Sequence, residues 1–303
     1  MRENRGGKLY SMNYGAVIAT AVDPIEKKPL YHFQPGSLSY SLAAVGCNFQ
    51  CEFCQNWQIS QWPRLEQKWP GHTVEPERVV REALATGCSS VAYTYTEPTI
   101  FMELAADIAG PAKEAGLANV FVSNGYMTRE ALDFAKDWLD AINVDLKSFR
   151  EEFYREVCKA RLGPVLDTLR YLAEETGIWL EVTTLVVPGQ NDSDEELGAI
   201  ARFIAEELGR EVPWHISRFH GAYRMDGEAA TPMERLEKAY ELGKEAGLRF
   251  IYVGNVPGTG KESTYCHECG SVLIERRGFQ VRANHVRAGA CPVCGTVLVG
   301  RGL

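Results

Sequence analysis

Three of the nine cysteines of this 303-residue chain lie close together, as Cys47, Cys51 and Cys54 in the spacing C-x₃-C-x₂-C. Thiolates at this spacing can bind a compact iron–sulfur cluster, and three of them leave one iron of a [4Fe–4S] cluster without a protein ligand. An open metal position usually receives a substrate or a cofactor. The alternative is a zinc site whose fourth ligand lies elsewhere in the chain.

A second group of cysteines stands near the C-terminus, as two C-x₂-C pairs that are each followed by glycine: Cys266, Cys269, Cys291 and Cys294. Four thiolates complete a tetrahedral shell, so this spacing predicts a zinc-ribbon or rubredoxin-like domain with no position for a substrate. Zinc as a structural ion is the prediction. A single iron and an auxiliary iron–sulfur cluster that passes electrons are the alternatives. Cys88 and Cys158 are predicted to be small buried hydrophobic residues.

The composition is that of a folded, acidic chain. Hydrophobic residues make up 45%, and 32 Lys and Arg stand against 40 Asp and Glu. This excludes a disordered chain and argues against nucleic acid as a partner, because phosphate neutralisation needs a basic face. No stretch approaches the roughly 18 apolar residues of a membrane helix, and the polar N-terminus lacks the apolar segment of a secretory signal. We therefore expect a cytoplasmic protein without a membrane partner.

Short apolar runs alternate with segments of helical periodicity along most of the chain. The runs predict strands at 39–45, 90–95, 119–122, 141–144, 179–187, 214–216 and 249–253. Helices are predicted after Ser193, where Glu196 completes a capping box, and after Pro76 and Pro232. Alternating strands and helices imply a parallel sheet with right-handed crossovers.

Polar residues fall at or just past the predicted carboxyl ends of many of these strands. They are Thr96, Glu97, Ser123, Asn124, Asp145, Lys147, Thr183, Thr184, His220 and Asn255. Such convergence is typical of the active face of a βα barrel. An open doubly wound sheet would instead show a glycine-rich turn after its first strand, where this chain has three cysteines.

The sequence therefore predicts an α/β fold: a partial or complete parallel βα barrel with a small C-terminal metal ribbon. We place the barrel at residues 37–260 and the four-cysteine metal ribbon at 261–303. About forty residues are too few to hold a core without a metal. Residues 1–36 are predicted to be an N-terminal extension that packs on the barrel.

The first cysteine motif resembles the signature of the radical S-adenosylmethionine (SAM) superfamily. Much of the chain resembles one branch of it, the radical SAM enzyme of the AmmeMemoRadiSam system, which is a relative of pyruvate formate-lyase activating enzymes. The stretches that carry the resemblance are 22–30, 46–57, 93–99, 145–147, 187–189, 214–220 and 253–258. Family members usually carry a further cysteine-containing segment upstream of a stretch like residues 2–10, and this chain begins inside that stretch.

The resemblance implies an activating-enzyme-like oxidoreductase. SAM would bind the open iron of a [4Fe–4S] cluster held by Cys47, Cys51 and Cys54, and reduction would cleave it to a 5′-deoxyadenosyl radical that abstracts a hydrogen atom. The resemblance also implies an electron donor, a substrate that is either a protein glycine or a small molecule, and Memo-like and Ammecr-like partner proteins. The alternative function is a catalytically silent metal-binding interaction module that acts through its four-cysteine ribbon.

The resemblance further implies which residues line the SAM pocket. Phe53 would lie beside the adenine, and Glu97 would meet the SAM ammonium, a cation that needs charge-assisted hydrogen bonds. Ser123 and Asn124 would lie near the ribose and the methionine carboxylate.

The remaining SAM candidates come from the later strands. Asp145 and Lys147 lie on one face of their strand; Lys147 would meet a carboxylate and Asp145 a hydroxyl or a cation, and the alternative is a salt bridge at the rim. His220 would face the adenosine, whereas His215 is expected to be structural. Thr183 stands where the activating enzymes carry arginine, and it is kept as a candidate. No catalytic residue is predicted beyond the cluster and the SAM pocket.

Overall fold

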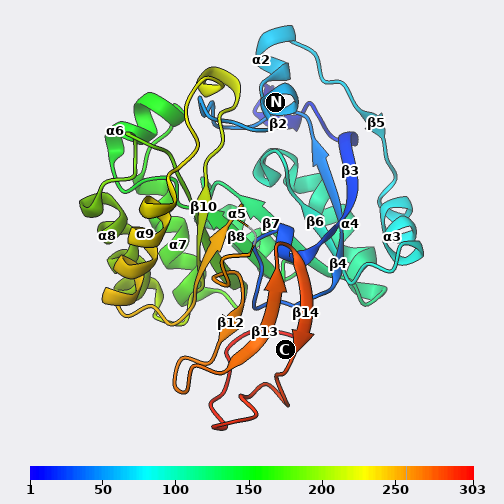
Figure 1. The fold of residues 1–303 in the computed structure, drawn as a ribbon. Helices are drawn as coiled ribbons and strands as arrows, with labels where there is room; N and C mark the ends of the chain where they lie inside the picture. Colours follow the sequence, from blue (N-terminus) through cyan, green and yellow to red (C-terminus); the bar gives the residue numbers. More distant parts are fainter. Residues whose placement is uncertain (257) are drawn as a thin grey trace.

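A nine-stranded sheet forms the centre of the computed structural model (Figure 1), in the order β11–β10–β9–β8–β7–β6–β4–β3–β5. The structure describes residues 1–256 and 258–303; Pro257, which belongs to the stretch 253–258 named above, lies outside the described residues. The strands of this sheet are β3 (Ala16–Pro24), β4 (Leu38–Ala44), β5 (His72–Thr73), β6 (Ser90–Tyr93), β7 (Ala118–Ser123), β8 (Ala141–Asp145), β9 (Trp179–Val186), β10 (Trp214–Arg218) and β11 (Ile251–Gly254).

The seven strands from β4 to β11 in the sheet order are parallel, and β3 and β5 extend the sheet antiparallel at one edge. Each predicted strand forms, with ends within two residues of the prediction. Most of their residues are buried, as expected for strands covered on both faces. Because β11 and β5 stand at opposite ends of the sheet, the barrel is partial. The predicted α/β fold is confirmed.

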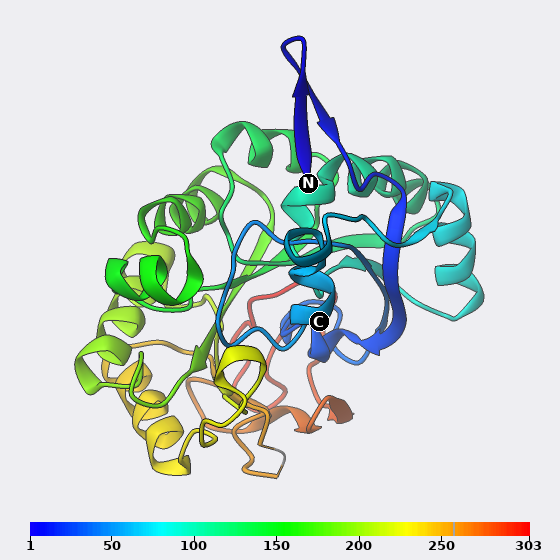
Figure 2. The ribbon, with the colours of Figure 1, turned by 90° about the horizontal axis from the view of Figure 1, so that it is seen from above.

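Helices cover the outer face of the sheet, and Figure 2 shows them as an arc around it. The longer ones are α3 (Pro76–Ala85), α4 (Met102–Glu114), α5 (Arg129–Ala135), α7 (Gly163–Glu175), α8 (Asp194–Phe203) and α9 (Met233–Glu245). Helix α8 begins as predicted, since the Ser193 side chain accepts a hydrogen bond from the Glu196 amide at 3.2 Å. None of the helices in the described ranges has the length and apolar character needed to span a bilayer.

Short helical segments fill several loops between these elements. They are α1 (Trp57–Ser60), α2 (Trp62–Glu66), α6 (Glu151–Phe153), and the 3₁₀ or π segments η1 (Ile25–Lys27), η2 (Pro98–Phe101), η3 (Tyr154–Cys158), η4 (Ile204–Leu208) and η5 (Tyr223–Met225). Two of them, η2 and η3, adjoin the cysteine-rich loop or the strand ends and bear on the site described below.

The first 36 residues are joined to the central sheet. A hairpin of β1 (Arg2–Arg5) and β2 (Lys8–Ser11) projects from the body (Figure 2), and β3 then pairs with β4. Beyond β3, the side chains of Ile25, Leu30 and Phe33 pack against alanines and a valine of the parallel strands. The boundaries at residues 36 and 260 stay a prediction.

The C-terminal residues form a separate three-stranded antiparallel sheet of β12 (Thr264–Tyr265), β13 (Val272–Arg277) and β14 (Gln280–Asn284). It lies at the opposite end of the molecule from the N-terminal hairpin (Figure 1). Its small core includes Cys266, Leu273 and Cys291 and is completed by Tyr31 and Tyr252 from outside the ribbon. The ribbon is therefore packed against the rest of the chain.

One buried arginine connects the ribbon to the region around η1. Arg276 of β13 donates hydrogen bonds to the Tyr31 carbonyl and the Thr264 hydroxyl, both at 2.7 Å, and its guanidinium lies 4.3 Å from the centre of the Tyr31 ring. Its Nε is 3.4 Å from the Glu26 carboxylate, and both side chains of this ion pair are fully buried. Burial raises the pKa of Glu26, and the positive charge of Arg276 opposes that rise.

Replacing Arg276 with methionine should destabilise the protein by about 3–5 kcal/mol, because Glu26 would stay buried without its cation. Denaturant unfolding of the protein, prepared without oxygen, measures the change. The matched control is Arg277→Met, whose side chain is exposed. Adding Glu26→Gln to Arg276→Met should recover part of the loss. Equal unfolding midpoints for the two methionine variants would contradict this account.

Candidate functional site

One cavity of about 570 Å³ lies at the carboxyl ends of the central strands. All three cysteines of the first motif line it. Seven of the eight residues predicted for SAM line it as well: Phe53, Glu97, Ser123, Asn124, Asp145, Lys147 and Thr183. The eighth, His220, is exposed and lies beside a neighbouring cavity of about 420 Å³ that shares Tyr31, Asn255 and Phe279 with the first.

The loop that carries the first cysteines is held to η3 by its backbone. The amides of Gln50 and Glu52 donate hydrogen bonds to the carbonyls of Cys158 and Val157, at 3.0 and 3.1 Å. Cys158 is fully buried, as predicted, and its thiol lies against that of Cys51. The loop therefore presents its thiols from a fixed backbone.

The sulfur atoms of this loop are suited to a cluster with several irons. Burial raises the pKa of Cys47, and the pKa of Cys54 is raised by the same cause. Such thiols need a metal to become thiolates. Among residues 1–256 and 258–303, the Sγ atoms of the four ribbon cysteines all lie within 4.8 Å of one another. The loop cysteines do not form so compact a group. Three cysteines of one loop that line the same cavity are the ligand set that a [4Fe–4S] cluster with one open iron needs, so the loop fits a cluster.

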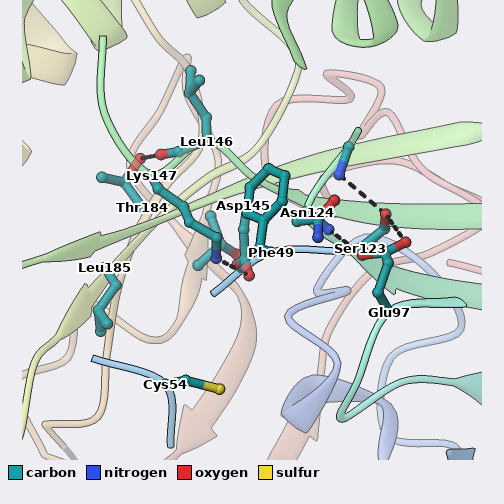
Figure 3. A network of polar contacts seen from close by, with 12 residues as sticks. Phe49, Cys54, Glu97, Ser123, Asn124, Asp145, Leu146, Lys147, Thr184 and Leu185 are labelled. Atoms are coloured by element: carbon teal, nitrogen blue, oxygen red, sulfur yellow. Dashed lines mark hydrogen bonds and ion pairs between the residues drawn. The ribbon is translucent and has the colours of Figure 1, made fainter. Parts of the chain in front are cut away.

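Glu97 is hydrogen-bonded to Ser123 and Asn124 at the end of β7 (Figure 3). It is 1% exposed. Its Oε1 accepts hydrogen bonds from the Thr99 amide (3.0 Å), the Thr99 hydroxyl (2.6 Å) and the Ser123 hydroxyl (2.8 Å). Its Oε2 accepts one, from the Asn124 amide at 2.8 Å. Burial raises the pKa of Glu97, and these donors oppose the rise. Oε2, with a single donor, has capacity for another.

Asp145 and Lys147 form an ion pair at the end of β8 (Figure 3), with Nζ 2.9 Å from Oδ2. The ammonium is 5.8 Å from the centre of the Phe53 ring. Burial by itself would lower the pKa of Lys147, but the negative charge of Asp145 and the nearby thiols outweigh burial and raise it. Lys147 therefore stays charged. Its side chain is 12% exposed and lines the cavity, so the N–H groups that do not bind Asp145 can bind an anion there.

Thr183 lies in the middle of β9 and not at its end, which corrects the prediction of its position. The parallel register places it level with Asp145 on one side and His215 on the other. Its hydroxyl donates to the Asn143 side chain at 2.8 Å. Thr183 reaches the cavity because the neighbouring strand β8 ends at that level.

Sequence reasoning missed a group of buried polar residues at the cavity, which belong neither to the cysteine loop nor to the residues predicted for SAM. Lys28 is 1% exposed, and its ammonium lies 2.6 Å from Asp23, which also accepts from Lys27, Ser41 and Tyr95. Burial lowers the pKa of Lys28 to about 8, against the effect of Asp23. The only sequence signal was the resemblance over residues 22–30, which named no function for them.

His215 is a second residue of this group, and sequence reasoning assigned it a structural role. It is 3% exposed, lines the cavity and is hydrogen-bonded to Glu181 of β9. The sequence signal that could have identified it is the alternation of side chains along β10. This alternation turns His215 and Ser217 to the same face of the strand, and both line the cavity.

The residues of this cavity match a known family. A model of the Radical SAM superfamily matches residues 42–204, more than half of the chain, including all three loop cysteines. The chain belongs to the radical SAM superfamily. A radical SAM domain implies an enzyme that uses a [4Fe–4S] cluster and SAM. The alternative of a silent interaction module is not favoured.

Several relatives of this radical SAM protein have known sequences or structures. An uncharacterized protein of Methanocaldococcus jannaschii is 47% identical over 97% of this chain and 87% of its own. The isethionate sulfite-lyase activating enzyme of Oleidesulfovibrio alaskensis is 28% identical, over only 32% of this chain and 30% of that enzyme. The crystal structure of Streptococcus suis SuiB bound to SAM shares the fold, with a TM-score of 0.55 and 14% identity, over 76% of this chain and 53% of that one.

The ribbon cysteines of this radical SAM protein form a compact four-sulfur site. The Sγ atoms of Cys266 and Cys294 are 3.5 Å apart, and those of Cys269 and Cys291 are 3.6 Å apart. A tetrahedral ion with metal–sulfur bonds of about 2.3 Å holds its thiolates about 3.8 Å apart. Burial raises the pKa of Cys266 to about 11, whereas hydrogen bonding with Ser271 lowers the pKa of Cys269 to about 6. The site therefore fits one zinc or iron ion.

Removing one ribbon thiol should release this ion without disturbing the cysteine loop. In Cys294→Ser, we expect one metal equivalent to be lost and amide hydrogen exchange to rise across residues 264–303, because the metal supplies most of the folding energy of so small a domain. Metal analysis of the intact protein should give about one zinc beside four irons. About eight irons and no zinc would instead identify an auxiliary cluster. Cys88→Ser, a buried cysteine outside both groups, is the control.

Proposed function

We propose that this chain is a radical SAM enzyme of the AmmeMemoRadiSam type, in which Cys47, Cys51 and Cys54 hold the [4Fe–4S] cluster. The observation that carries the proposal is that one cavity of about 570 Å³ is lined by these three cysteines and by seven of the residues expected to bind SAM. When bound, the cluster and SAM supply a 5′-deoxyadenosyl radical that abstracts a hydrogen atom from the substrate.

The charged groups of the cavity support a placement for SAM. Oε2 of Glu97 has capacity for one more donor, and an ammonium there would make a charge-assisted hydrogen bond. Lys147 is held in its charged form by Asp145 and suits the SAM carboxylate. Phe53 packs under Lys147 and supplies an apolar face for the adenine. Ser123 and Asn124 have their own hydrogen bonds to Glu97 and so act through its position.

The substrate of the proposed enzyme is a protein glycine or a small molecule. The partial similarity to an activating enzyme supports the first, and SuiB, of similar fold, has been crystallised with its precursor peptide. The buried polar group that includes Lys28 and His215 supports a small polar molecule, because a glycine backbone offers few groups for it to recognise. Memo-like and Ammecr-like proteins and an electron donor complete the proposed set of partners.

The cysteine assignment predicts which change abolishes the chemistry. Purified and reconstituted without oxygen, the protein should be brown and should convert SAM to methionine and 5′-deoxyadenosine when dithionite is added. Cys51→Ala should lose both colour and turnover, because two thiolates hold the cluster poorly. Cys88→Ala is the matched control, since Cys88 is equally buried but lies away from the cavity. SAM cleavage by Cys51→Ala would exclude the assignment.

The assignment of Glu97 predicts an effect on SAM affinity. A charge-assisted hydrogen bond contributes about 1.5–3 kcal/mol, so Glu97→Gln should weaken SAM binding to the unreduced protein by about ten- to a hundredfold. Glu97→Ala should weaken it further, because the ammonium then has no partner. Equilibrium binding with the cluster intact measures both.

The control for these variants is another buried carboxylate that accepts several hydrogen bonds. Glu196 is 4% exposed and accepts from Ser148, the Phe149 amide and Arg150, outside the cavity. Glu196→Gln should lower stability much as Glu97→Gln does and leave the SAM dissociation constant unchanged. If the two variants change SAM affinity equally, Glu97 acts only through folding.

A further inference from the structure

His215 is placed on the cavity wall by the register of the sheet. Its strand neighbour on β9 is Thr183, whose own neighbour on β8 is Asp145. All three line the cavity. The three side chains therefore form one row across adjacent strands, with the charged Asp145 at one end and an imidazole at the other.

A buried carboxylate fixes how this imidazole is protonated. Glu181 is fully buried and accepts four hydrogen bonds: from the amides of Tyr31 (3.0 Å) and His32 (2.8 Å), the Trp179 indole (3.0 Å) and Nε2 of His215 (2.6 Å). Burial alone would raise the pKa of Glu181, but the hydrogen bond from His215 and the other donors outweigh it and lower the pKa. The two amides and the indole can only donate, so Glu181 is the acceptor in this group and Nε2 of His215 carries a hydrogen; in the neutral ring Nδ1 then carries the lone pair.

Nδ1 of His215 has no hydrogen-bond partner among the residues that the structure describes, and it is not among the polar atoms sealed from solvent. The other titratable groups packed on the ring are the phenols of Tyr31 and Tyr252, whose pKa values burial raises. They stay neutral. Nδ1 therefore faces the cavity, and none of the described residues forms a hydrogen bond with it.

His32 shows what a purely structural histidine looks like in the same neighbourhood. It is fully buried, and both of its ring nitrogens are used, Nδ1 by the Val299 carbonyl at 2.8 Å and Nε2 by the Tyr252 hydroxyl. It does not appear on the cavity wall. His215 differs in having one nitrogen oriented by a carboxylate and the other open, which is how a general base is arranged in a catalytic triad.

We propose that His215, oriented by Glu181, accepts the proton of a hydroxyl or amine on the substrate carbon that loses its hydrogen atom. This rests on the function proposed above. In that step the O–H or N–H bond breaks, an Nδ1–H bond forms, and the electron pair stays on the substrate oxygen or nitrogen. A hydrogen bond from this O–H or N–H to Nδ1 positions the substrate before abstraction, and the proton moves to Nδ1 afterwards, because a radical on the adjacent carbon makes the O–H or N–H more acidic. The substrate class is therefore a small alcohol or amine.

The first test is the tautomer of His215, read from the ¹⁵N chemical shifts of its ring nitrogens in the full-length protein with the cluster oxidised. The protein has six histidines, and His215→Asn and His32→Gln assign the two signals. We expect a protonated Nε2 and a bare Nδ1 for His215, and the opposite tautomer for His32. Glu181→Gln should allow His215 both tautomers. A protonated Nδ1 in the wild type, or loss of the bare Nδ1 signal when SAM is bound, would overturn the proposal.

The second test uses 2-propanol-d8 as a neutral alcohol probe, with SAM and dithionite. The readout is the fraction of 5′-deoxyadenosine that contains deuterium, which does not depend on how much SAM is cleaved. At a subsaturating probe concentration, His215→Phe should lower this fraction by about two- to tenfold, the factor that one neutral hydrogen bond contributes. His32→Gln should keep the wild-type fraction. Acetone-d6, which lacks a hydroxyl, should give a fraction that does not depend on residue 215.

The two tests separate this proposal from the proposed function. If the protein makes no 5′-deoxyadenosine at all, the function has failed, while the tautomer of His215 is still measured. If deuterium from 2-propanol-d8 enters 5′-deoxyadenosine equally in the wild type and in His215→Phe, the proton acceptor is excluded and the radical chemistry stands.

Discussion

A carboxylate that is removed from water must be surrounded by donors, and in this structure the donors of Glu97 come from two segments of the chain. Thr99 belongs to the loop after β6, and Ser123 and Asn124 to the end of β7. Asn124 in turn donates to Asn48 at 2.6 Å, inside the cysteine loop. Because an unsatisfied buried charge costs several kcal/mol, the solvation of one carboxylate fixes the strand ends and the cysteine loop relative to each other.

The same principle operates at Glu181, which holds the cavity residue His215, and at Glu26, which lines the cavity. Glu181 orders the backbone at Tyr31 as well as His215, and Glu26 is held by Arg276 from the ribbon. Tyr31 is the common element, because it packs against His215 with a ring separation of 4.7 Å and under the Arg276 guanidinium. The C-terminal metal site is thus connected through packed side chains to the cavity residues where we place the substrate.

Sequence reasoning predicted the features that are local in the chain and failed where contacts are distant. Each parallel strand was predicted because a run of buried residues is visible in a short window. Strand β3, which lies between β4 and the short edge strand β5, was missed because its exposed and buried residues do not alternate regularly. The contact between His215 and Glu181 was not predicted, because the two residues are 34 positions apart. Arg276 was missed for the same reason, since it lies 250 positions from Glu26 and exposed arginines outnumber buried ones.

The charged and polar groups of the cavity form two sets. Near the cysteine loop, Lys147 is paired with Asp145, and Glu97 keeps one oxygen with room for a further donor, an arrangement that suits a zwitterion such as the methionine part of SAM. In the second set, Asp23 is shared by Lys27 and Lys28, and His215 has one ring nitrogen without a partner among the described residues. A ligand there needs a hydrogen-bond donor for that nitrogen. In the placement proposed above, SAM has its partners at Glu97 and Lys147, so the second set is chemically distinct, and a substrate bound to it would lie within the same cavity as SAM.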